Sequence, residues 1–343
     1  MVSFDLLNLP HASSNRRDLL RRAAGAGLAL PALGGLAMTA QAQDDKSDDM
    51  GHAMVTSQGA PPAGFKLYDP ALPAVKAGPK EITIVAKDAT LPIGQEAIFA
   101  GWTFDGTIPG RMLRVVEGDM IDFTFKVDPA AATGHSLDFH SAKTAPNESY
   151  RTLQPGGELN YQFQVKYPGV YMYHCGTPPI LMHLGSGMYG AMIVDPKEGW
   201  VPAQEFGIVQ SEFYLHVEDD RTMTPDYGKM VGYGNMDFCV FNGYANQYVD
   251  NPIAVEIKAP IRVFVMNAGP NAWSNFHVVG TIFDRVLING NPKNELVGLQ
   301  SITIGPGDGA VAEFTLDAPG SYPFVNHAFG HAAHGAVGVF KAM

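Results

Sequence analysis

From about residue 80 onward, apolar and polar residues alternate in short segments. Examples are KEITIVAKDA, MLRVVEGDMIDFTFKV, LNYQFQVKYPGVYMYH and YGAMIVD, which are rich in valine, isoleucine, phenylalanine and tyrosine. Glycine, proline, asparagine and aspartate separate these segments, and no long amphipathic helical pattern lies between them. A two-residue period with such turn residues predicts β-strands. Short strands at a spacing of roughly 8–12 residues are typical of a sandwich or barrel, so the pattern predicts an all-β fold.

The strand pattern occurs twice along the chain. Each half contains a strand after a turn of the form F-[DN]-G, a Gly-rich loop, a strand that ends at PG-x-Y, a residue able to bind a metal, and a closing strand. A repeat of this kind predicts two tandem β-sandwich domains. The connector DPKEGWVPAQE, residues 195–205, contains proline and charged residues, as domain linkers often do. We therefore predict domains at residues 80–196 and 197–343.

The first 79 residues have a different character. Residues 1–42 contain the pair Arg16 and Arg17, then an apolar stretch rich in alanine, glycine and leucine, and end in the small-residue sequence AQA. This pattern predicts a twin-arginine export signal and hence a periplasmic protein. An uncleaved membrane anchor is the alternative, because the apolar run is about long enough to span a bilayer. Residues 43–79 are polar and rich in glycine and proline, which predicts a flexible lead-in.

Composition and charge narrow the classes of partner. The chain has 343 residues, of which 46% are hydrophobic and 17% are charged, so it can bury a sizeable core. Its formal net charge of −11 argues against nucleic acid as a ligand, because phosphates require basic patches. A cationic protein partner is compatible with this charge.

The segment YMYHCGTPPILMHLGSGM, residues 171–188, carries the metal-binding chemistry. Thiolate and imidazole together suit copper or zinc, and two histidines, a cysteine and a weak thioether describe an electron-transfer copper site. Cys175, His183 and Met188 are close enough in sequence to come from one strand end and the loop after it. A second histidine must come from elsewhere, and GHSLDFH, residues 134–140, offers two.

Strand alternation divides these residues between two sites. Neighbouring side chains of a strand point to opposite faces, so His174 and Cys175 cannot serve the same site. His135 and His140, five residues apart, would also face opposite ways if their segment is extended. The first predicted site contains His135, Cys175, His183 and Met188. The second contains Asp138, His140 and His174, and the peptide bond between His174 and Cys175 would join the two.

The second site needs a third protein ligand, because open catalytic metal sites usually have three. The segment FVNHAFGHAAHGA supplies His327, His331 and His334. We favour His327, because it follows a predicted strand as the ligands of the first half do, and the other two remain alternatives. His277 in NFHVVGTIFD has no cysteine or methionine companion, which suits a proton donor that faces the substrate.

The chain resembles the copper-containing nitrite reductases of the two-domain cupredoxin kind. The resemblance runs from about residue 80 to the end of the chain and is carried by HSLDFH, YHCGTPPILMHLGSGMYGAMIV, VFNG, FHVVGTIFD and YPFVNHAF. It implies two Greek-key cupredoxin domains. It implies a type 1 copper held by His135, Cys175, His183 and Met188, and a type 2 copper held by His140, His174 and His327. Asp138 and His277 match the family's proton-handling residues, and Val279 matches an apolar residue of its nitrite pocket.

The same resemblance implies an assembly and a mechanism. It implies a homotrimer in which the second domain of one subunit completes the type 2 site of the next. An electron from a separate donor, a small cupredoxin or a cytochrome c, would enter at the type 1 copper and reduce nitrite to nitric oxide at the type 2 copper. The chain departs from the most familiar members in the spacing from Cys175 to His183 and in the extra residues His331 and His334.

Two other functions compete with nitrite reduction. A laccase-like multicopper oxidase needs paired His-x-His motifs, and this sequence contains none. A non-catalytic electron carrier needs only the first site, which would leave Asp138, His140, His277 and His327 without a role. Hydroxylamine or oxygen reduction at the second site is an additional activity compatible with the sequence. The other cysteine, Cys239 in MDFCVFNG, is expected to be a buried apolar side chain.

Overall fold

The computed structural model describes residues 61–62, 64–72, 74–218, 222–233 and 235–343. The predicted export signal at residues 1–42 and most of the predicted lead-in lie outside the described residues. Strands dominate the described part, and its helices are short. The prediction of an all-β fold is therefore confirmed. Among these residues, no helix is long and apolar enough to cross a membrane.

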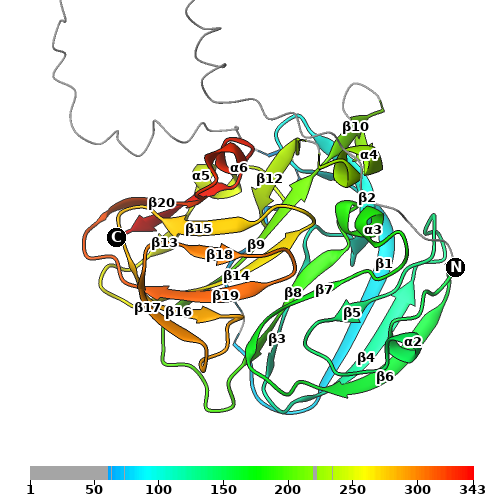
Figure 1. Ribbon diagram of the computed structural model, residues 1–343, viewed down its shortest axis with the longest axis horizontal. Helices are drawn as coiled ribbons and strands as arrows, with labels where there is room; N and C mark the ends of the chain where they lie inside the picture. The colour runs from blue at the N-terminus through cyan, green and yellow to red at the C-terminus, as the bar shows by residue number, and fades with distance from the viewer. Residues whose placement is uncertain (1–60, 63, 73, 219–221, 234) are drawn as a thin grey trace, which may run out of the picture. The chain divides into compact units, whose positions relative to one another are not determined.

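Two sheets are built mainly from the first half of the chain (Figure 1, cyan to green). One has the order β10 (Leu215–Val217), β11 (Thr222–Pro225), β2 (Ile98–Phe104), β1 (Lys80–Pro92), β4 (Met120–Val127) and β6 (Glu158–Gln164). The other has the order β3 (Gly110–Val116), β8 (Tyr189–Asp195), β7 (Gly169–His174) and β5 (Asp138–Phe139). Apolar side chains from both sheets form one core, which also contains Cys175 and Met188.

The second half forms two further sheets (Figure 1, yellow-green to red). One has the order β12 (Phe238–Phe241), β9 (Gln204–Phe213), β14 (Ile261–Gly269), β19 (Gly309–Phe314), β16 (Phe283–Ile288) and β17 (Glu295–Leu299). The other has the order β13 (Asn251–Val255), β21 (Val337–Ala342), β20 (Gly320–Asn326), β15 (Ser274–Val278) and β18 (Ile302–Ile304). A separate core lies between them.

Five short helices are found in the described part of the chain. They are α2 (Pro146–Ser149), α3 (Ile180–Gly185), α4 (Tyr227–Val231), α5 (Gln247–Asp250) and α6 (Phe329–Ala333). Helix α3 lies in the segment 171–188, which was predicted to bind a metal, between the end of β7 and the start of β8. Helix α6 follows β20 in the corresponding part of the second half.

A third apolar cluster joins the two halves. It combines Val170 and Met172 of β7 with Phe264 and Met266 of β14 and Val311 of β19. Strands β7 and β8 therefore have protein on both faces, and every residue of β8 is buried. Complete burial explains why YGAMIVD is almost continuously apolar and does not alternate.

One strand pair departs from the predicted domain organisation. Strands β10 and β11 follow residue 196, yet β11 pairs with β2 and so extends a sheet of the first half. The segment between β9 and β12 thus returns to the first sandwich before the chain continues the second. The boundary itself, between residues 196 and 197, stays a prediction.

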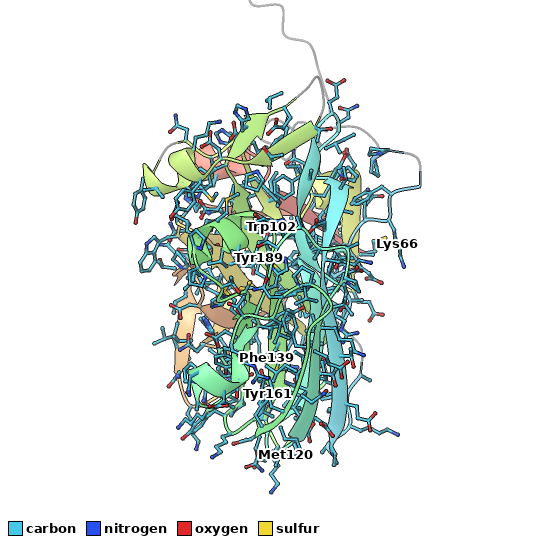
Figure 2. All side chains as sticks on the ribbon, turned by 90° about the vertical axis from the view of Figure 1, so that its right-hand side faces the viewer. Lys66, Trp102, Met120, Phe139, Tyr161 and Tyr189 are labelled. Carbon is cyan, nitrogen blue, oxygen red and sulfur yellow. The ribbon has the colours of Figure 1, made fainter. Side chains whose placement is uncertain are left out.

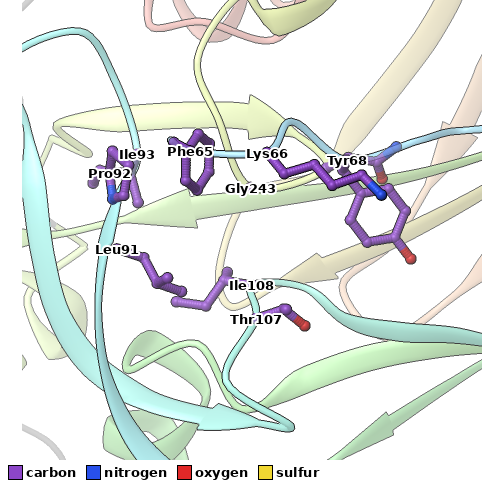
Figure 3. A pocket seen from close by; sticks show the side chains of 10 residues that line it. Phe65, Lys66, Tyr68, Leu91, Pro92, Ile93, Thr107, Ile108 and Gly243 are labelled. Atoms are coloured by element: carbon purple, nitrogen blue, oxygen red, sulfur yellow. The ribbon is translucent and has the colours of Figure 1, made fainter. Parts of the chain in front are cut away.

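The segment after residue 64 also bridges the halves (Figure 3). The hydroxyl of Tyr68 accepts a hydrogen bond from the backbone N–H of Met112 on β3, at 2.9 Å. The backbone N–H of Tyr68 donates to Gln247 Oε1 at 3.1 Å, and the hydroxyl of Tyr248 donates to the Tyr68 carbonyl at 3.1 Å. A cavity of about 70 Å³ lies beside this segment, lined in part by Phe65 and Ile108.

Buried ion pairs also connect the halves. Glu205 accepts from Arg114 of β3 at 2.8 Å and from Arg262 of β14 at 2.7 Å. Arg262 also pairs with Glu313 at 2.6 Å, and its guanidinium lies 4.6 Å from the ring centroid of Trp200. Only 3% of the Arg262 side chain is exposed. Removal of one partner from such a network leaves a charge buried without its full set of contacts, which is costly.

We predict that Arg262→Ala lowers the free energy of unfolding by about 3 kcal/mol, the lower end of the range for a broken buried pair. The lower end is expected because Glu205 keeps Arg114 and Glu313 keeps Arg285. Urea denaturation measures the change. Lys126→Ala, which breaks an exposed pair with Glu158, is the control and should have little effect. Equal effects of the two substitutions would contradict the prediction.

Candidate functional site

The end of β7 directs neighbouring side chains to different parts of the molecule. Tyr173 and Cys175 belong to the core of the first half, whereas Met172 belongs to the cluster between the halves. His174 shares the outward direction of Met172, and in the strand pairing it stands opposite Asp138 of β5. The chain thus presents Cys175 to the interior of the first sandwich and His174 to its outer side.

The first group of potential ligands, called the buried set below, is His135, Cys175, His183 and Met188. His183 Nδ1 lies 3.2 Å from His135 Nδ1 and 3.2 Å from Cys175 Sγ. His135, Cys175 and Met188 have no exposed surface, and His183 is 3% exposed. The backbone N–H of Cys175 donates to the Met188 carbonyl at 3.1 Å, which ties the two ends of the segment together.

The loop that carries the buried set is held by helix α3 and a glycine. The helix begins after Pro179 and presents His183 in its last turn. Gly187 then adopts a φ of +106°, and a Cβ there would lie 2.4 Å from Ile108 Cδ1. Only glycine fits this turn, which brings Met188 back into the core beside Cys175.

Burial controls the protonation of the buried set. It lowers the pKa of His135 and His183 to about 4, and the proximity of His183 contributes to the shift of His135. Burial raises the pKa of the Cys175 thiol, while hydrogen bonds from Ser136 and Thr177 oppose this. The backbone N–H of Ser136 donates to Cys175 Sγ at 3.4 Å.

The buried set fits a soft metal ion. Two uncharged imidazole nitrogens and a sulfur face one another at contact distance, and these donor types bind copper or zinc. A bound cation would also favour the thiolate, because it counteracts the effect of burial on the thiol. The thioether of Met188 is a further soft donor in the same core.

Trp102 of β2, which is labelled in Figure 2, packs on the buried set and was not singled out by the sequence. Its ring centroid lies 4.6 Å from that of His183 and 5.5 Å from that of His135. The indole is partly exposed, so it stands between solvent and the two imidazoles. Trp102 carries no metal-binding atom, and its contact with these histidines depends on tertiary packing.

The second group, called the open set, is Asp138, His140 and His174. Their ligand atoms lie within 4.8 Å of one another. His140 Nε2 is 3.0 Å from His174 Nε2, and Asp138 Oδ2 is 4.0 Å from His174 Nε2. His140 is exposed and Asp138 is partly exposed, so a small molecule can approach this set.

Backbone carbonyls orient both imidazoles of the open set. His174 Nδ1 lies 2.9 Å from the Cys175 carbonyl, which can only accept, so this nitrogen carries the proton. The imidazole of His140 donates to the Gly307 carbonyl, in the loop between β18 and β19 of the second half. Desolvation by the surrounding protein and the neighbouring His174 lower the pKa of His140, although part of its side chain stays exposed. Each Nε2 is thereby available to a metal.

His277 and His327 form a separate pair in the second half. Their ring centroids lie 5.3 Å apart, and both line a cavity of about 250 Å³ together with Gln300 and Ser301. His277 Nδ1 donates to the Gln300 carbonyl at 2.5 Å. Val279, two residues after His277, is exposed. Within the described part of one chain, His327 is not among the atoms grouped with His140 and His174.

The two other histidines near His327 have ring nitrogens engaged within the chain. The amide nitrogen of Asn326 lies 2.8 Å from His331 Nδ1. His334 Nδ1 donates to the Gly330 carbonyl at 2.6 Å. Phe329 packs on His327, with ring centroids 4.7 Å apart. Cys239 is fully buried in the second core, as expected for an apolar side chain.

The buried set makes the stability of the metal-free protein depend on pH. The unfolded chain binds protons near the ordinary histidine pKa of 6.5, whereas His135 and His183 bind them only near pH 4. Stability is therefore lost as pH falls from about 6.5 towards 4, by about 2 kcal/mol per histidine at pH 5.

Urea denaturation of the metal-free protein at pH 7 and pH 5 measures this loss. The double variant His135→Gln, His183→Gln should have a smaller difference between the two pH values. An unchanged difference would mean that other groups cause the acid sensitivity.

Comparisons with known proteins extend these observations. Residues 86–199 match a family model described as a multicopper oxidase. A copper-containing nitrite reductase of Neisseria meningitidis serogroup B is 39% identical over 264 residues, which are 75% of this chain and 66% of the relative. The chain thus spans about two thirds of the length of that relative.

Solved structures agree with the sequence comparison. A copper nitrite reductase from Nitrosomonas europaea has a TM-score of 0.71 and 33% identity, over 77% of this chain and 94% of that one. A copper-containing nitrite reductase from Thermus scotoductus has a TM-score of 0.71 and 33% identity, over 78% of this chain and 62% of that one. The chain belongs to the family of copper-containing nitrite reductases.

Proposed function

We propose that this protein is a copper-dependent nitrite reductase that forms nitric oxide and water. The observation that carries the proposal is the junction of the buried set and the open set at a single peptide bond, between His174 and Cys175. An electron carrier would need only the buried set. The family relationship supports the same reaction, because the relatives named above are copper-containing nitrite reductases.

We assign the ligands as follows. His135, Cys175, His183 and Met188 would hold a type 1 copper, and His140, His174 and His327 would hold a type 2 copper. Copper in these sites would supply the single electron of the reaction and a Lewis-acidic position for nitrite. The His174–Cys175 peptide gives the two sets the shortest covalent connection that a chain can provide.

The protein's own residues would supply the protons. Reduction of nitrite to nitric oxide and water consumes one electron and two protons. Asp138 lies beside His174 at the open face, and His277 keeps its Nδ1 proton on the Gln300 carbonyl, which leaves its Nε2 to exchange protons with substrate. Val279 would form an apolar wall of the nitrite pocket. Proton donation of this kind typically contributes about 10²–10⁴ in rate.

Completion of the open set requires a second subunit in this proposal. The open set provides two histidines, and catalytic metal sites usually have three protein ligands. His327 is exposed in the other half of the chain, where it pairs with His277. We propose a homotrimer in which His277 and His327 of one subunit face Asp138, His140 and His174 of the next.

The cellular setting is also a proposal. Residues 1–42 would direct export by the twin-arginine route, so that the enzyme works in the periplasm. Its electrons would come from a separate small cupredoxin or cytochrome c. A cationic docking face on that donor would complement the acidic chain, which has a net charge of −11.

The test of the proposed function is electron paramagnetic resonance of the copper-loaded protein with and without nitrite, combined with detection of nitric oxide under a one-electron reductant. We expect two distinct cupric signals, of which nitrite changes only one, and formation of nitric oxide. A single type 1 signal without nitric oxide would refute an enzymatic role.

We predict that Asp138→Asn lowers turnover by about 10²–10⁴ while both coppers stay bound, because the amide keeps the shape of the carboxylate but cannot act as an acid. Steady-state nitric oxide formation and copper analysis measure the two effects. Asp122→Asn, an exposed carboxylate on β4, is the control and should leave turnover unchanged. Full activity of Asp138→Asn would remove Asp138 from the mechanism.

Subunit mixing distinguishes a shared site from one built within a chain. We predict that His327→Ala and His140→Ala are each inactive alone, and that mixed oligomers of the two recover activity. Recovery is expected because one type of interface then combines intact His140 and His174 with an intact His327. Activity is assayed after the separately purified variants are dissociated and reassembled together. Inactive mixtures whose mixed composition is verified by native mass spectrometry would argue against a shared site.

A further inference from the structure

Asn326, the residue before His327, is fully buried and has a saturated set of hydrogen bonds. Its Oδ1 accepts from the backbone N–H of Asn275 at 3.0 Å and from that of Ala328 at 3.1 Å. Its Nδ2 donates to Gln210 Oε1 at 3.0 Å and to the Trp273 carbonyl at 3.2 Å. The same nitrogen lies 2.8 Å from His331 Nδ1.

The two backbone N–H groups that donate to Asn326 Oδ1 lie next to His277 and His327 in the chain. Asn275 precedes His277 by two residues on β15, and Ala328 directly follows His327. The backbone N–H of His327 in turn donates to the Asn275 carbonyl at 2.7 Å. One side chain therefore fixes the end of β20 against the strand that carries His277.

A buried polar network anchors Asn326 in the sheet behind it. Gln210 of β9 accepts from the hydroxyl of Ser274 at 2.8 Å as well as from Asn326. Asn267 of β14 lies 3.5 Å from the Gln210 amide nitrogen, and its own amide donates to the Ala272 and Ile304 carbonyls. None of these four side chains is exposed. A fully satisfied network in the interior is rigid and specifies one arrangement.

We propose that Asn326 is a positioning residue for His327 and His277, and that His331 belongs to the same support rather than to the ligands. This inference rests on the proposed function, because it assumes that His327 is a ligand of the type 2 copper. The amide nitrogen of Asn326 cannot accept a hydrogen bond, so His331 Nδ1 can only accept from it, by sharing one of its two N–H groups with the Gln210 or Trp273 oxygen. The proton of the neutral His331 ring is then on Nε2. His331 thus carries an N–H at Nε2, and its Nδ1 lone pair is engaged by Asn326. Neither ring nitrogen therefore has a free lone pair with which to bind a metal.

The experiment measures type 2 copper affinity in the full-length protein by competition with a copper chelator. Asn326→Ala should weaken type 2 binding by about 10–100-fold, as loss of a partner that orients a metal ligand typically does. The type 1 absorption band and the oligomeric state, measured on the same samples, should not change. Asn326→Asp keeps an acceptor for the two backbone N–H groups and should recover part of the affinity.

Asn242→Ala is the matched control. Asn242 is also a buried asparagine of the second half, and it binds Val209, Gly207 and Tyr248 instead of the residues around the histidine pair. Its φ of 52° makes alanine at least as costly there for stability. It should lower the melting temperature but leave type 2 affinity unchanged.

The inference is overturned if Asn326→Ala and Asn242→Ala affect type 2 affinity alike, or if Asn326→Ala also removes the type 1 band. His331→Ala should leave type 2 affinity within about threefold of the unmodified protein, well below the loss expected for a ligand. A loss as large as that of His327→Ala would instead make His331 a ligand. Failure of the unmodified, copper-loaded protein to reduce nitrite would refute the proposed function, whereas these affinities test the positioning role independently of nitrite.

Discussion

The alternation of side chains at the end of β7 is the constraint on which the rest of the site depends. His174 and Cys175 are adjacent, so they face opposite sides of a sheet that has protein on both faces. One side is the core of the first sandwich, where the cysteine meets two buried imidazoles. The other side opens towards Asp138 and His140. The two ligand sets therefore lie in chemically different environments on opposite faces of one sheet.

The two environments differ because burial differs. Burial lowers the pKa of His135 and His183 to about 4, which keeps both imidazoles neutral and ready to bind a metal ion. The open set lies at the surface of the chain, where a small anion can approach it and where the proposed ligand from another subunit would join it. A deeply buried set suits electron transfer, since its geometry is fixed by packing. An exposed set suits substrate exchange.

The sequence was sufficient for features that depend on local pattern. Alternation predicted the strands, and the residue types between positions 134 and 188 predicted the two ligand groups that the fold brings together. The sequence did not predict contacts between segments that are far apart along the chain. Strand β11 pairs with β2 across more than a hundred residues. Trp102 reaches the buried set because β2 meets the end of α3, where the backbone N–H of Trp102 donates to the Ser186 carbonyl. Neither contact leaves a periodic or chemical signal in the chain.

The choice among the three histidines of FVNHAFGHAAHGA illustrates the same limit. All three are chemically able to bind copper, and spacing alone does not distinguish them. Hydrogen-bond partners separate only His331 from the others, because its Nδ1 faces the amide nitrogen of Asn326. The Nδ1 of His334 donates to the Gly330 carbonyl, and this leaves its Nε2 available, as the Cys175 carbonyl does for His174. The ring of His327 instead packs between two aromatic rings, those of His277 and Phe329. Which of these nitrogens is free to meet a metal therefore depends on tertiary contacts, and the ligand role of His327 stays a proposal.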